Sequence, residues 1–332
     1  MEYQTLGKTG VKVSRLCFGT MSFGSIADEE SSQAMFERCR EAGINFFDCA
    51  NVYAGGRSEK ILGRLIADCR HEIVLTSKVG FPTGDDVNAE GLSRRHIVRS
   101  VEESLKRLGT DHIDLYFVHR FDRQTSIEQT LRALDDLVHQ GKVLYTGVSN
   151  WAAWQIATAL GISRQKGLAP FDCLQPMYNL VKRQAEVEIL PLAEAEHLGV
   201  IPYSPLGGGL LTGKYGVDRR PESGRIVERD MYARRYSRDV YYEIADRFGA
   251  HAAERGLAPA TLAVAWVMAH PAVTAPIIGA RNVEQLEESL AAPAVKMTPK
   301  WRAEISALSL EPPPATDRLE ERMGTAYQGA NE

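Results

Sequence analysis

The chain has 332 residues, of which 44% are hydrophobic and 25% charged, and its formal net charge at pH 7 is -4. These values are ordinary for a globular protein, and the slight negative charge argues against nucleic acid or an anionic membrane as a partner. No apolar run approaches the roughly 20 residues of a membrane span and no signal-peptide pattern opens the sequence, so we expect a cytoplasmic protein.

Strand and helix patterns alternate along the chain. A short hairpin is predicted first, between Tyr3 and Val13, with its turn at Gly7 to Gly10. Eight apolar strands are then predicted, with helical patterns between them. The strands span Leu16 to Phe18, Asn45 to Phe47, Ile73 to Thr76, Ile113 to Val118, Val143 to Gly147, Cys173 to Gln175, Val200 to Pro202 and Ala275 to Ile278.

The clearest helical patterns lie at Ser31 to Glu41, Arg94 to Leu108 and Ile127 to Val138, where apolar residues recur every three or four positions. The strands are continuous apolar runs, which is typical of a parallel sheet buried on both faces. Eight strand–helix units predict a closed (β/α)8 barrel rather than an open sheet. Because no Pro-, Gly- or Ser-rich linker divides the chain, we expect residues 1–332 to form a single domain.

Polar residues stand at the ends of three successive apolar strands. Asp48, Lys78 and His119 close their strands, and Tyr53 follows in the next loop. A buried charge must be paired, and the carboxyl ends of barrel strands meet at one mouth, so we expect these side chains to converge. Together they make a proton-donating device: the lysine charge lowers the tyrosine pKa, the carboxylate holds the lysine, and the imidazole orients a carbonyl.

Six segments in this order resemble the aldo-keto reductases over nearly the whole chain. The residue after the second strand, Cys49, is a departure because the family often has threonine there, and we predict that it contacts no catalytic atom. The segments are Gly43–Asp48 with Ala50 and Tyr53–Gly55, Thr76–Lys78, Asp114–Tyr116 with His119 and Arg120, Gly147–Asn150, Tyr203–Leu206 with Leu211–Lys214, and Gly279–Arg281 with Gln285 and Leu286.

The resemblance implies an NADPH-dependent enzyme that reduces small aldehydes or ketones to alcohols. Tyr53 is then the general acid, assisted by Lys78, Asp48 and His119, and no metal is needed. The matching positions for the cofactor are Ser149, Asn150 and Gln175 for the carboxamide, Tyr203 for stacking on the nicotinamide, and Ser204, Leu206, Gly209 and Lys214 for the pyrophosphate. The adenosine end matches at Gly279, Arg281, Gln285 and Glu288.

The cofactor preference rests on one residue. Many relatives carry Lys-Ser at 279 and 280 and Arg at 285, whereas this chain has Gly279, Ala280 and Gln285. The Gly-Ala-Arg variant belongs to bacterial NADPH-using branches, which leaves Arg281 as the only nearby cation for a 2′-phosphate. We therefore expect NADPH rather than NADH.

Three regions have roles that stay open. The long polar segment 215–239 is either a solvated loop of mixed charge or a flap over the cofactor. The tail from Glu311 opens with three prolines, and the resemblance implies that Leu319 to Tyr327 line the substrate pocket. An apolar, aromatic mouth is expected from Phe23, Phe121 and Trp151 beside Tyr53.

Other functions are less favoured. Gly208 to Lys214 nearly matches a P-loop, but Tyr215 replaces the required Ser or Thr, and Gly19 to Gly24 lacks the middle glycine of a dinucleotide fingerprint. A metal-dependent hydrolase would need clustered ligands, and the five cysteines are scattered, without a Cys-x-x-Cys pair. The remaining alternative is a cofactor-binding regulatory subunit resembling potassium-channel β-subunits.

Overall fold

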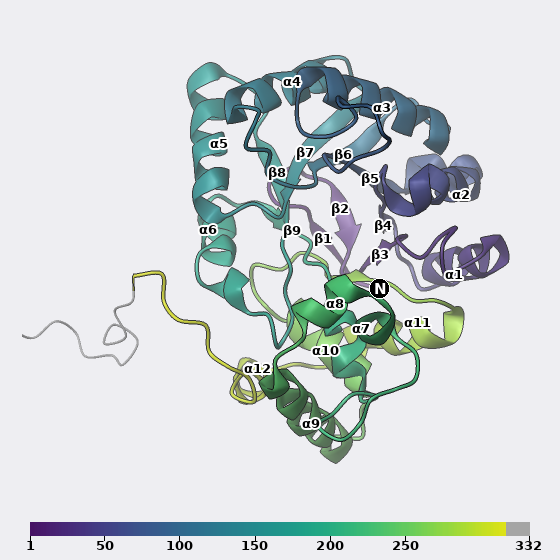
Figure 1. Cartoon of the computed structure of the whole chain (residues 1–332), viewed down its shortest axis with the longest axis vertical. Helices are drawn as coiled ribbons and strands as arrows, with labels where there is room; N and C mark the ends of the chain where they lie inside the picture. The colour runs from purple at the N-terminus through teal and green to yellow at the C-terminus, as the bar shows by residue number, and fades with distance from the viewer. Residues whose placement is uncertain (317–332) are drawn as a thin grey trace, which may run out of the picture.

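The computed structural model describes residues 1–316 and has the predicted barrel architecture. Eight parallel strands follow one another around the sheet in the order β10-β3-β4-β5-β6-β7-β8-β9, with helices outside them (Figure 1). The two end strands are joined by backbone hydrogen bonds, from Thr274 N to Val200 O at 2.8 Å and from Ile277 N to Pro202 O at 2.9 Å. These bonds close the sheet, and the (β/α)8 prediction is confirmed.

The strands agree with the sequence patterns in position and differ in length. β5 and β7 each run two or three residues further than predicted, whereas β9 and β10 are short because the chain leaves the regular ladder where the barrel closes. Their bounds are β3 Cys17–Gly19, β4 Phe46–Asp48, β5 Val74–Val79, β6 Ile113–Val118, β7 Val143–Ser149, β8 Phe171–Gln175, β9 Gly199–Val200 and β10 Ile277–Ile278.

The predicted N-terminal hairpin closes the bottom of the barrel. Strands β1 (Tyr3–Thr5) and β2 (Lys12–Ser14) pair antiparallel, with Tyr3 opposite Ser14. Leu6 and Val13 are buried with the inward-facing side chains of the barrel strands. The hairpin therefore seals the amino-terminal end of the sheet, and only the other end is left for a ligand.

The helices follow local signals where these are strong. Helix α3 spans Arg94–Leu108 as predicted, because Ser93 caps its first turn and Gly109, at φ 66°, ends it. Helix α1 begins before Ser31, since Asp28 accepts a hydrogen bond from Ser31 N at 2.8 Å. The longer helices are α1 Glu29–Glu41, α2 Arg57–Ile66, α3 Arg94–Leu108, α4 Ile127–His139, α5 Ala153–Lys166, α6 Ile189–Ala195, α9 Asp239–Glu254, α10 Pro259–Met268, α11 Val283–Leu290 and α12 Pro299–Ser306.

The segment 215–239 is structured. It contains the short helices α7 (Arg225–Glu228) and α8 (Asp230–Arg235), and Ile226, Tyr232 and Tyr236 are buried in the main core. The solvated-loop interpretation is therefore wrong for residues 224–236, whereas residues 217–223 form no helix or strand and are largely exposed. The predicted pocket residues Leu319 to Tyr327 lie outside the described residues.

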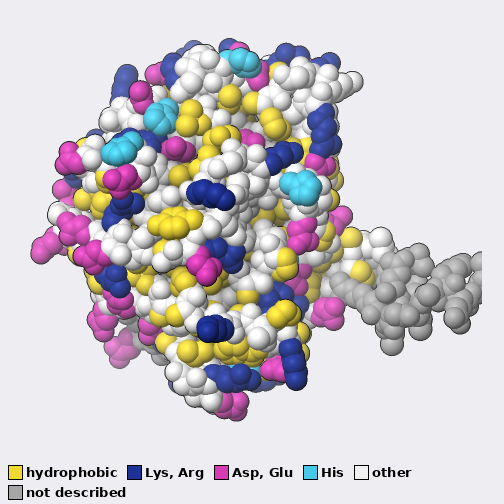
Figure 2. Space-filling view, turned by 180° about the vertical axis from the view of Figure 1, so that it is seen from behind, with side chains coloured by type: hydrophobic (Ala, Val, Ile, Leu, Met, Phe, Trp, Pro, Cys, Tyr) yellow, Lys and Arg dark blue, Asp and Glu magenta, His cyan; other side chains and the backbone are white. Residues whose placement is uncertain are grey.

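Surface charge is mixed in sign. Figure 2 shows Lys and Arg side chains interspersed with Asp and Glu over one face of the molecule, with many acidic groups along one edge. Within residues 1–316, no helix combines the length and the apolar character needed to cross a membrane.

Candidate active site

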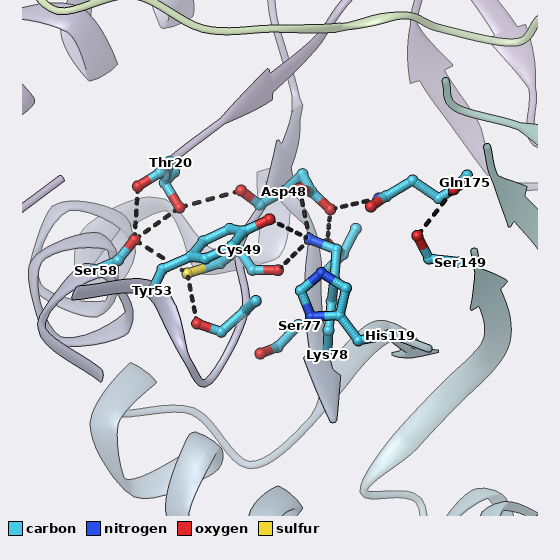
Figure 3. Close-up of polar contacts among 12 residues, drawn as sticks. Thr20, Asp48, Cys49, Tyr53, Ser58, Ser77, Lys78, His119, Ser149 and Gln175 are labelled. Atoms are coloured by element: carbon cyan, nitrogen blue, oxygen red, sulfur yellow. Dashed lines mark hydrogen bonds and ion pairs between the residues drawn. The ribbon is translucent and has the colours of Figure 1, made fainter. Parts of the chain in front are cut away.

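A buried lysine lies at the centre of the site. Lys78, near the end of β5, is fully buried, and its Nζ lies 2.6 Å from Asp48 Oδ2, 2.6 Å from the Cys49 carbonyl oxygen and 3.3 Å from Tyr53 Oη (Figure 3). Asp48 ends β4, the neighbouring strand, and Tyr53 opens the short 3-10 helix η1 (Tyr53–Gly56). The lysine thus links three groups from adjacent segments.

Asp48 is held as firmly as the lysine. Besides Lys78, its carboxylate accepts hydrogen bonds from Thr76 Oγ1 at 2.7 Å and from Gln175 Nε2 at 2.9 Å. Because three donors from two strands, β5 and β8, converge on one buried carboxylate, its orientation is fixed before any ligand binds.

Burial and charge act in opposite directions on Lys78 and Tyr53. Burial is the largest single influence on the pKa of Lys78 and lowers it, but Asp48, Tyr53 and Cys49 together outweigh burial and raise the net pKa, so the lysine stays charged. For Tyr53, burial is the largest influence and raises the pKa to about 12, while Lys78 opposes that rise. The direction predicted for the lysine's effect is right, but burial outweighs it, and the phenol keeps its proton at neutral pH.

His119, like Tyr53, is neutral. It follows β6 (Ile113–Val118), and burial, with Lys78 and Arg120 nearby, holds its pKa well below the ordinary value. Its ring meets Phe81 edge-on, with the ring centres 4.7 Å apart, and its Nδ1 is buried without a hydrogen-bond partner among the described residues. An uncharged imidazole retains one N–H, which suits donation to a carbonyl oxygen.

The prediction that Cys49 contacts no catalytic atom is wrong. Its backbone carbonyl accepts one of the short hydrogen bonds of Lys78, and its Sγ lies 3.3 Å from Ser58 Oγ. The lysine contact involves only the main chain, so it does not depend on whether the side chain is cysteine or threonine. Burial raises the thiol pKa to about 12, and the group is therefore unreactive at neutral pH.

The site opens into one large cavity of about 1020 Å³. Ligand pockets commonly measure about 300–1,000 Å³, so this one has room for an extended molecule. Asp48, Tyr53 and His119 line it, and Lys78 lies beneath its wall. The structure also brings together every residue predicted to hold the cofactor: Ser149, Asn150, Gln175, Tyr203, Ser204, Leu206, Gly209, Lys214, Gly279, Arg281, Gln285 and Glu288.

The end of the cavity near Asp48 is lined with amide and hydroxyl groups. Tyr203 Oη donates to Asn150 Oδ1 at 2.7 Å, and Ser149 Oγ donates to the Gln175 carbonyl at 2.9 Å. Asn150 and Ser204 both have φ 60°, a left-handed conformation that non-glycine residues adopt rarely and that clusters at functional sites. The side-chain oxygen of Gln175 accepts no hydrogen bond from the described residues, which leaves an acceptor for a ligand amide.

The other end is basic and rich in glycine. Gly208 and Gly209 have φ of 69° and 101° in the turn of 3-10 helix η4 (Gly207–Thr212). Lys214 lines the cavity close to them, and burial, then Arg281, lowers its pKa. Open backbone and clustered cations are features of anion-binding sites.

The prediction that Arg281 is the only nearby cation is wrong. Lys214 and Arg225 line the same cavity, Lys214 lies close enough to Arg281 for that charge to lower its pKa, and Arg281 itself contacts Glu228 at 3.3 Å. The residues contributed by segment 215–239 escaped prediction because no local pattern says which arginine of a polar run faces inward.

The predicted substrate residues are elsewhere. Phe23 is fully buried in the core against Phe18, and Trp151 packs edge-on between Phe121 and Phe171, so none of the three lines the cavity. Apolar side chains from the loops after successive strands, together with one from α8, line it instead. They are Met21, Val52, Phe81 and Met231. Position just after a strand end does not single them out, because Phe121 and Trp151 lie equally close to the ends of β6 and β7.

The chain matches the aldo/keto reductase family over residues 15–309. A probable voltage-gated potassium channel subunit beta from Oryza sativa subsp. japonica is 36% identical to it, over 96% of this chain and 99% of the relative. The uncharacterized oxidoreductase YrpG of Bacillus subtilis is 38% identical, over 90% and 92%, and the versiconal hemiacetal acetate reductase of Aspergillus parasiticus is 33% identical, over 90% and 94%. These matches support a general oxidoreductase role, and the chain belongs to the aldo/keto reductase family.

Proposed function

We propose that the protein reduces aldehydes or ketones to alcohols, with NADPH as the reductant and Tyr53 as the proton donor. The observation that carries the proposal is the contact of the Tyr53 phenol with a buried, charged lysine at the wall of a large cavity. NADPH, when bound, supplies the hydride that the carbonyl carbon accepts. The forming alkoxide oxygen then needs a proton, which the Tyr53 hydroxyl is placed to give.

Each neighbour of Tyr53 has a distinct role in that proton transfer. Lys78 stabilises the phenolate that remains after the proton has left, and so offsets part of the effect of burial on the pKa. Asp48 keeps Lys78 charged and in place. His119, held neutral, donates a hydrogen bond to the carbonyl oxygen and orients it.

The donor and acceptor set around the cavity fits a nicotinamide cofactor. Ser149, Asn150 and Gln175 would hold the carboxamide, and Tyr203 would pack against the ring. Lys214, Gly209 and the neighbouring backbone would hold the pyrophosphate. With these assignments, the reducing end of the cofactor would lie beside Asp48 and Tyr53.

Arg281 is proposed to favour NADPH over NADH. A charge-assisted hydrogen bond contributes about 1.5–3 kcal/mol to the free energy of binding. Lys214 and Arg225 line the same cavity, so they partly compensate when the Arg281 charge is removed. Arg281→Ala should therefore raise the Kd for NADPH about tenfold, the low end of that range, and leave the Kd for NADH nearly unchanged. Fluorescence titration with both cofactors measures this. Equal weakening of the two would place Arg281 on a part of the cofactor that they share.

The carbonyl substrate is proposed to be apolar near its reacting group. Met21, Val52 and Phe81 line the cavity around Tyr53 and His119, and they offer no charge to recognise. A panel of aromatic, aliphatic and charged aldehydes and ketones, followed by NADPH absorbance, tests both the reaction and the preference. Turnover of apolar carbonyls is expected, and no turnover of any of them would overturn the proposal.

A second candidate is a cofactor-binding regulatory subunit. It is favoured by the similarity to the rice relative, whose name describes a channel subunit. The same panel separates the two candidates: a protein that binds NADPH tightly but turns over no carbonyl would favour the regulatory role.

A cytoplasmic location and a single domain over residues 1–332 are also part of the proposal. The location is supported by Cys17, Cys39, Cys49, Cys69 and Cys173, which are all free in the structure, as is usual in a reducing compartment.

A further inference from the structure

The turn that carries Tyr53 is held internally only by main-chain hydrogen bonds, from Tyr53 N to Ala50 O at 3.1 Å and from Gly55 N to Val52 O at 3.2 Å. The three residues after Tyr53, namely Ala54, Gly55 and Gly56, all have positive φ, and for Ala54, at φ 49°, this conformation is rarely adopted. Helix α2 begins immediately afterwards, with Gly56 at its N-cap position and no side-chain capping bond. A hydrogen bond from Asn51 N to the Lys78 carbonyl oxygen, at 3.4 Å, ties the start of the loop to β5, and contacts made by α2 fix the other end of the turn.

Ser58, in the first turn of α2, is one such contact. It is fully buried, and its hydroxyl donates to Thr20, at 2.8 Å from the carbonyl oxygen and 2.9 Å from Oγ1. The Cys49 thiol lies 3.3 Å away on the other side, as Figure 3 shows. This residue thus joins α2 to the ends of β3 and β4, next to Asp48.

Glu59, the next residue, joins α2 to β5, the strand that carries Lys78. Its carboxylate is fully buried and accepts hydrogen bonds from Ser77 Oγ at 2.6 Å and Arg107 Nε at 2.6 Å. Ser77 precedes Lys78 on β5. One buried carboxylate on α2, the helix that follows the Tyr53 turn and begins at Arg57, is therefore hydrogen-bonded to the strand that carries the lysine.

Arg107 of α3 packs against both the Tyr53 turn and Glu59. A Cβ on Gly56 would lie 2.9 Å from Arg107 Cδ, so the arginine stem lies directly against the backbone of the Tyr53 turn. Its guanidinium also pairs with Glu59, whose side chain has no exposed surface. The groups that fix the turn are thus packed together outside the cavity, and none of them lines it.

We propose that Ser58, Glu59 and Ser77 are positioning residues that hold the Tyr53 hydroxyl within reach of Lys78 Nζ. The inference rests on the proposed function, in which these two groups act together. A mutation far from the reacting atoms can cost about 100-fold in rate if it moves a catalytic group by about 1 Å. A small shift of the turn that carries Tyr53 is therefore enough to lower the rate. Cofactor binding should not depend on these residues, because they do not reach the cavity.

Two variants, each with a matched control, test the proposal. Ser77→Ala removes the bond between β5 and Glu59, and Glu59→Gln removes the buried charge while keeping the size of the side chain. Ser14→Ala is the control for the first, since buried Ser14 donates to the Leu16 carbonyl at the bottom of the barrel. Asp114→Asn is the control for the second, because Asp114 pairs with Arg70 at 2.7 Å, near the start of β6.

Each variant is assayed well below its melting temperature, with kcat and the Kd for NADPH measured separately. Ser77→Ala and Glu59→Gln should lose at least about tenfold in kcat and bind NADPH within about twofold of wild type. The controls should lose thermal stability without losing kcat. Unchanged kcat in the two test variants would overturn the proposal, as would an equal loss of kcat in the controls.

The distance between Tyr53 Oη and Lys78 Nζ gives a readout that needs no substrate. Crystal structures of Ser77→Ala and wild type should show it lengthening from 3.3 Å to beyond about 3.5 Å, the limit of a hydrogen bond. An unchanged distance contradicts the positioning role. A wild-type protein that reduces no carbonyl contradicts the proposed function instead, and this distance still tests the inference.

Discussion

A lysine without contact to water can stay charged only if the protein replaces its hydration. Around Lys78 the replacements are a carboxylate, a carbonyl oxygen and a phenol, all within 3.3 Å of Nζ. Asp48 supplies the opposite charge, and its own remaining oxygen accepts from Thr76 and Gln175. Because each member satisfies its neighbours, removing one should leave a buried charge without a partner.

Lys78→Met should damage both activity and stability. The variant leaves Asp48 buried and unpaired, which costs roughly 3–5 kcal/mol in the free energy of unfolding. It also removes the charge that stabilises the Tyr53 phenolate, so kcat should fall by at least about 100-fold. Denaturant unfolding and steady-state kinetics measure the two effects.

Lys142→Met is the control for that experiment. Lys142 pairs with Glu102 on the surface, where both side chains are partly exposed, and such pairs contribute about 0–1 kcal/mol. A Lys78→Met protein as stable and as active as this control would contradict the buried-charge account.

The chemistry of individual residues was predictable because it follows from strand ends. Asp48, Lys78 and His119 lie at or next to the ends of β4, β5 and β6, and parallel strands bring those ends together whatever the loops do. The net pKa of Tyr53 was not predictable, since burial depends on side chains from many segments. For the same reason the apolar lining was misjudged: Phe23 and Met21 are two residues apart, and only the loop conformation decides which one faces the cavity.

At the scale of elements, the helices that cover the barrel are placed by local caps and by close approach to their neighbours. Both ends of helix α3 were predicted correctly because the residues that fix them, the Ser93 cap and the terminal Gly109, are recognisable in the sequence. Helices α7 and α8 were missed because they are short, and their buried residues Ile226 and Tyr232 stand among charges without helical spacing. Tertiary contacts, rather than propensity, stabilise such segments.

Replacement by alanine should have opposite effects on stability at two helical glycines, because one of them lies where α2 approaches α3 closely. A Cβ on Gly63 of α2 would lie 2.4 Å from the Leu108 carbonyl oxygen, which is backbone and cannot rotate away. Gly63→Ala should therefore destabilise the fold by about 1–3 kcal/mol, as overpacking usually does. Gly161 of α5 has open space, so Gly161→Ala should stabilise by up to about 1 kcal/mol through helix propensity.

Thermal and denaturant unfolding of the two alanine variants checks this pair. Changes of the same sign in both would mean that helix propensity or general flexibility, rather than the α2–α3 contact, decides the outcome.

At the scale of the whole molecule, two groups outside the active site should contribute to the response of stability to acid with opposite signs, in addition to the contribution of buried His119. Burial raises the pKa of Asp172 to about 6, so between the two pKa values the folded state keeps a proton that the unfolded state has lost. The contribution of Asp172 to stability is therefore present at low pH and is lost as the pH rises through about 6. Burial, then Arg302, lowers the pKa of His270 to about 4, so stability is lost as pH falls from about 6.5 towards 4.

Single variants should separate the two effects. Asp172→Asn should stabilise the protein at pH 7 and steepen its loss of stability on acidification, whereas His270→Asn should flatten that loss. Each change should be on the order of 1–3 kcal/mol, because one pKa unit corresponds to about 1.4 kcal/mol. Urea unfolding between pH 4.5 and 7, the range suggested by these two pKa values, measures the slopes. Slopes that change in the same direction in both variants would contradict the assignment.

The central claim is that carbonyl reduction at this site depends on the Tyr53 hydroxyl. The most direct measurement is the turnover of Tyr53→Phe with a carbonyl that the wild type reduces, alongside its Kd for NADPH. The ring and its packing remain, so cofactor binding should be unchanged, while loss of the general acid should lower kcat by at least about 100-fold. Turnover like that of the wild type, with NADPH binding intact, would contradict the claim.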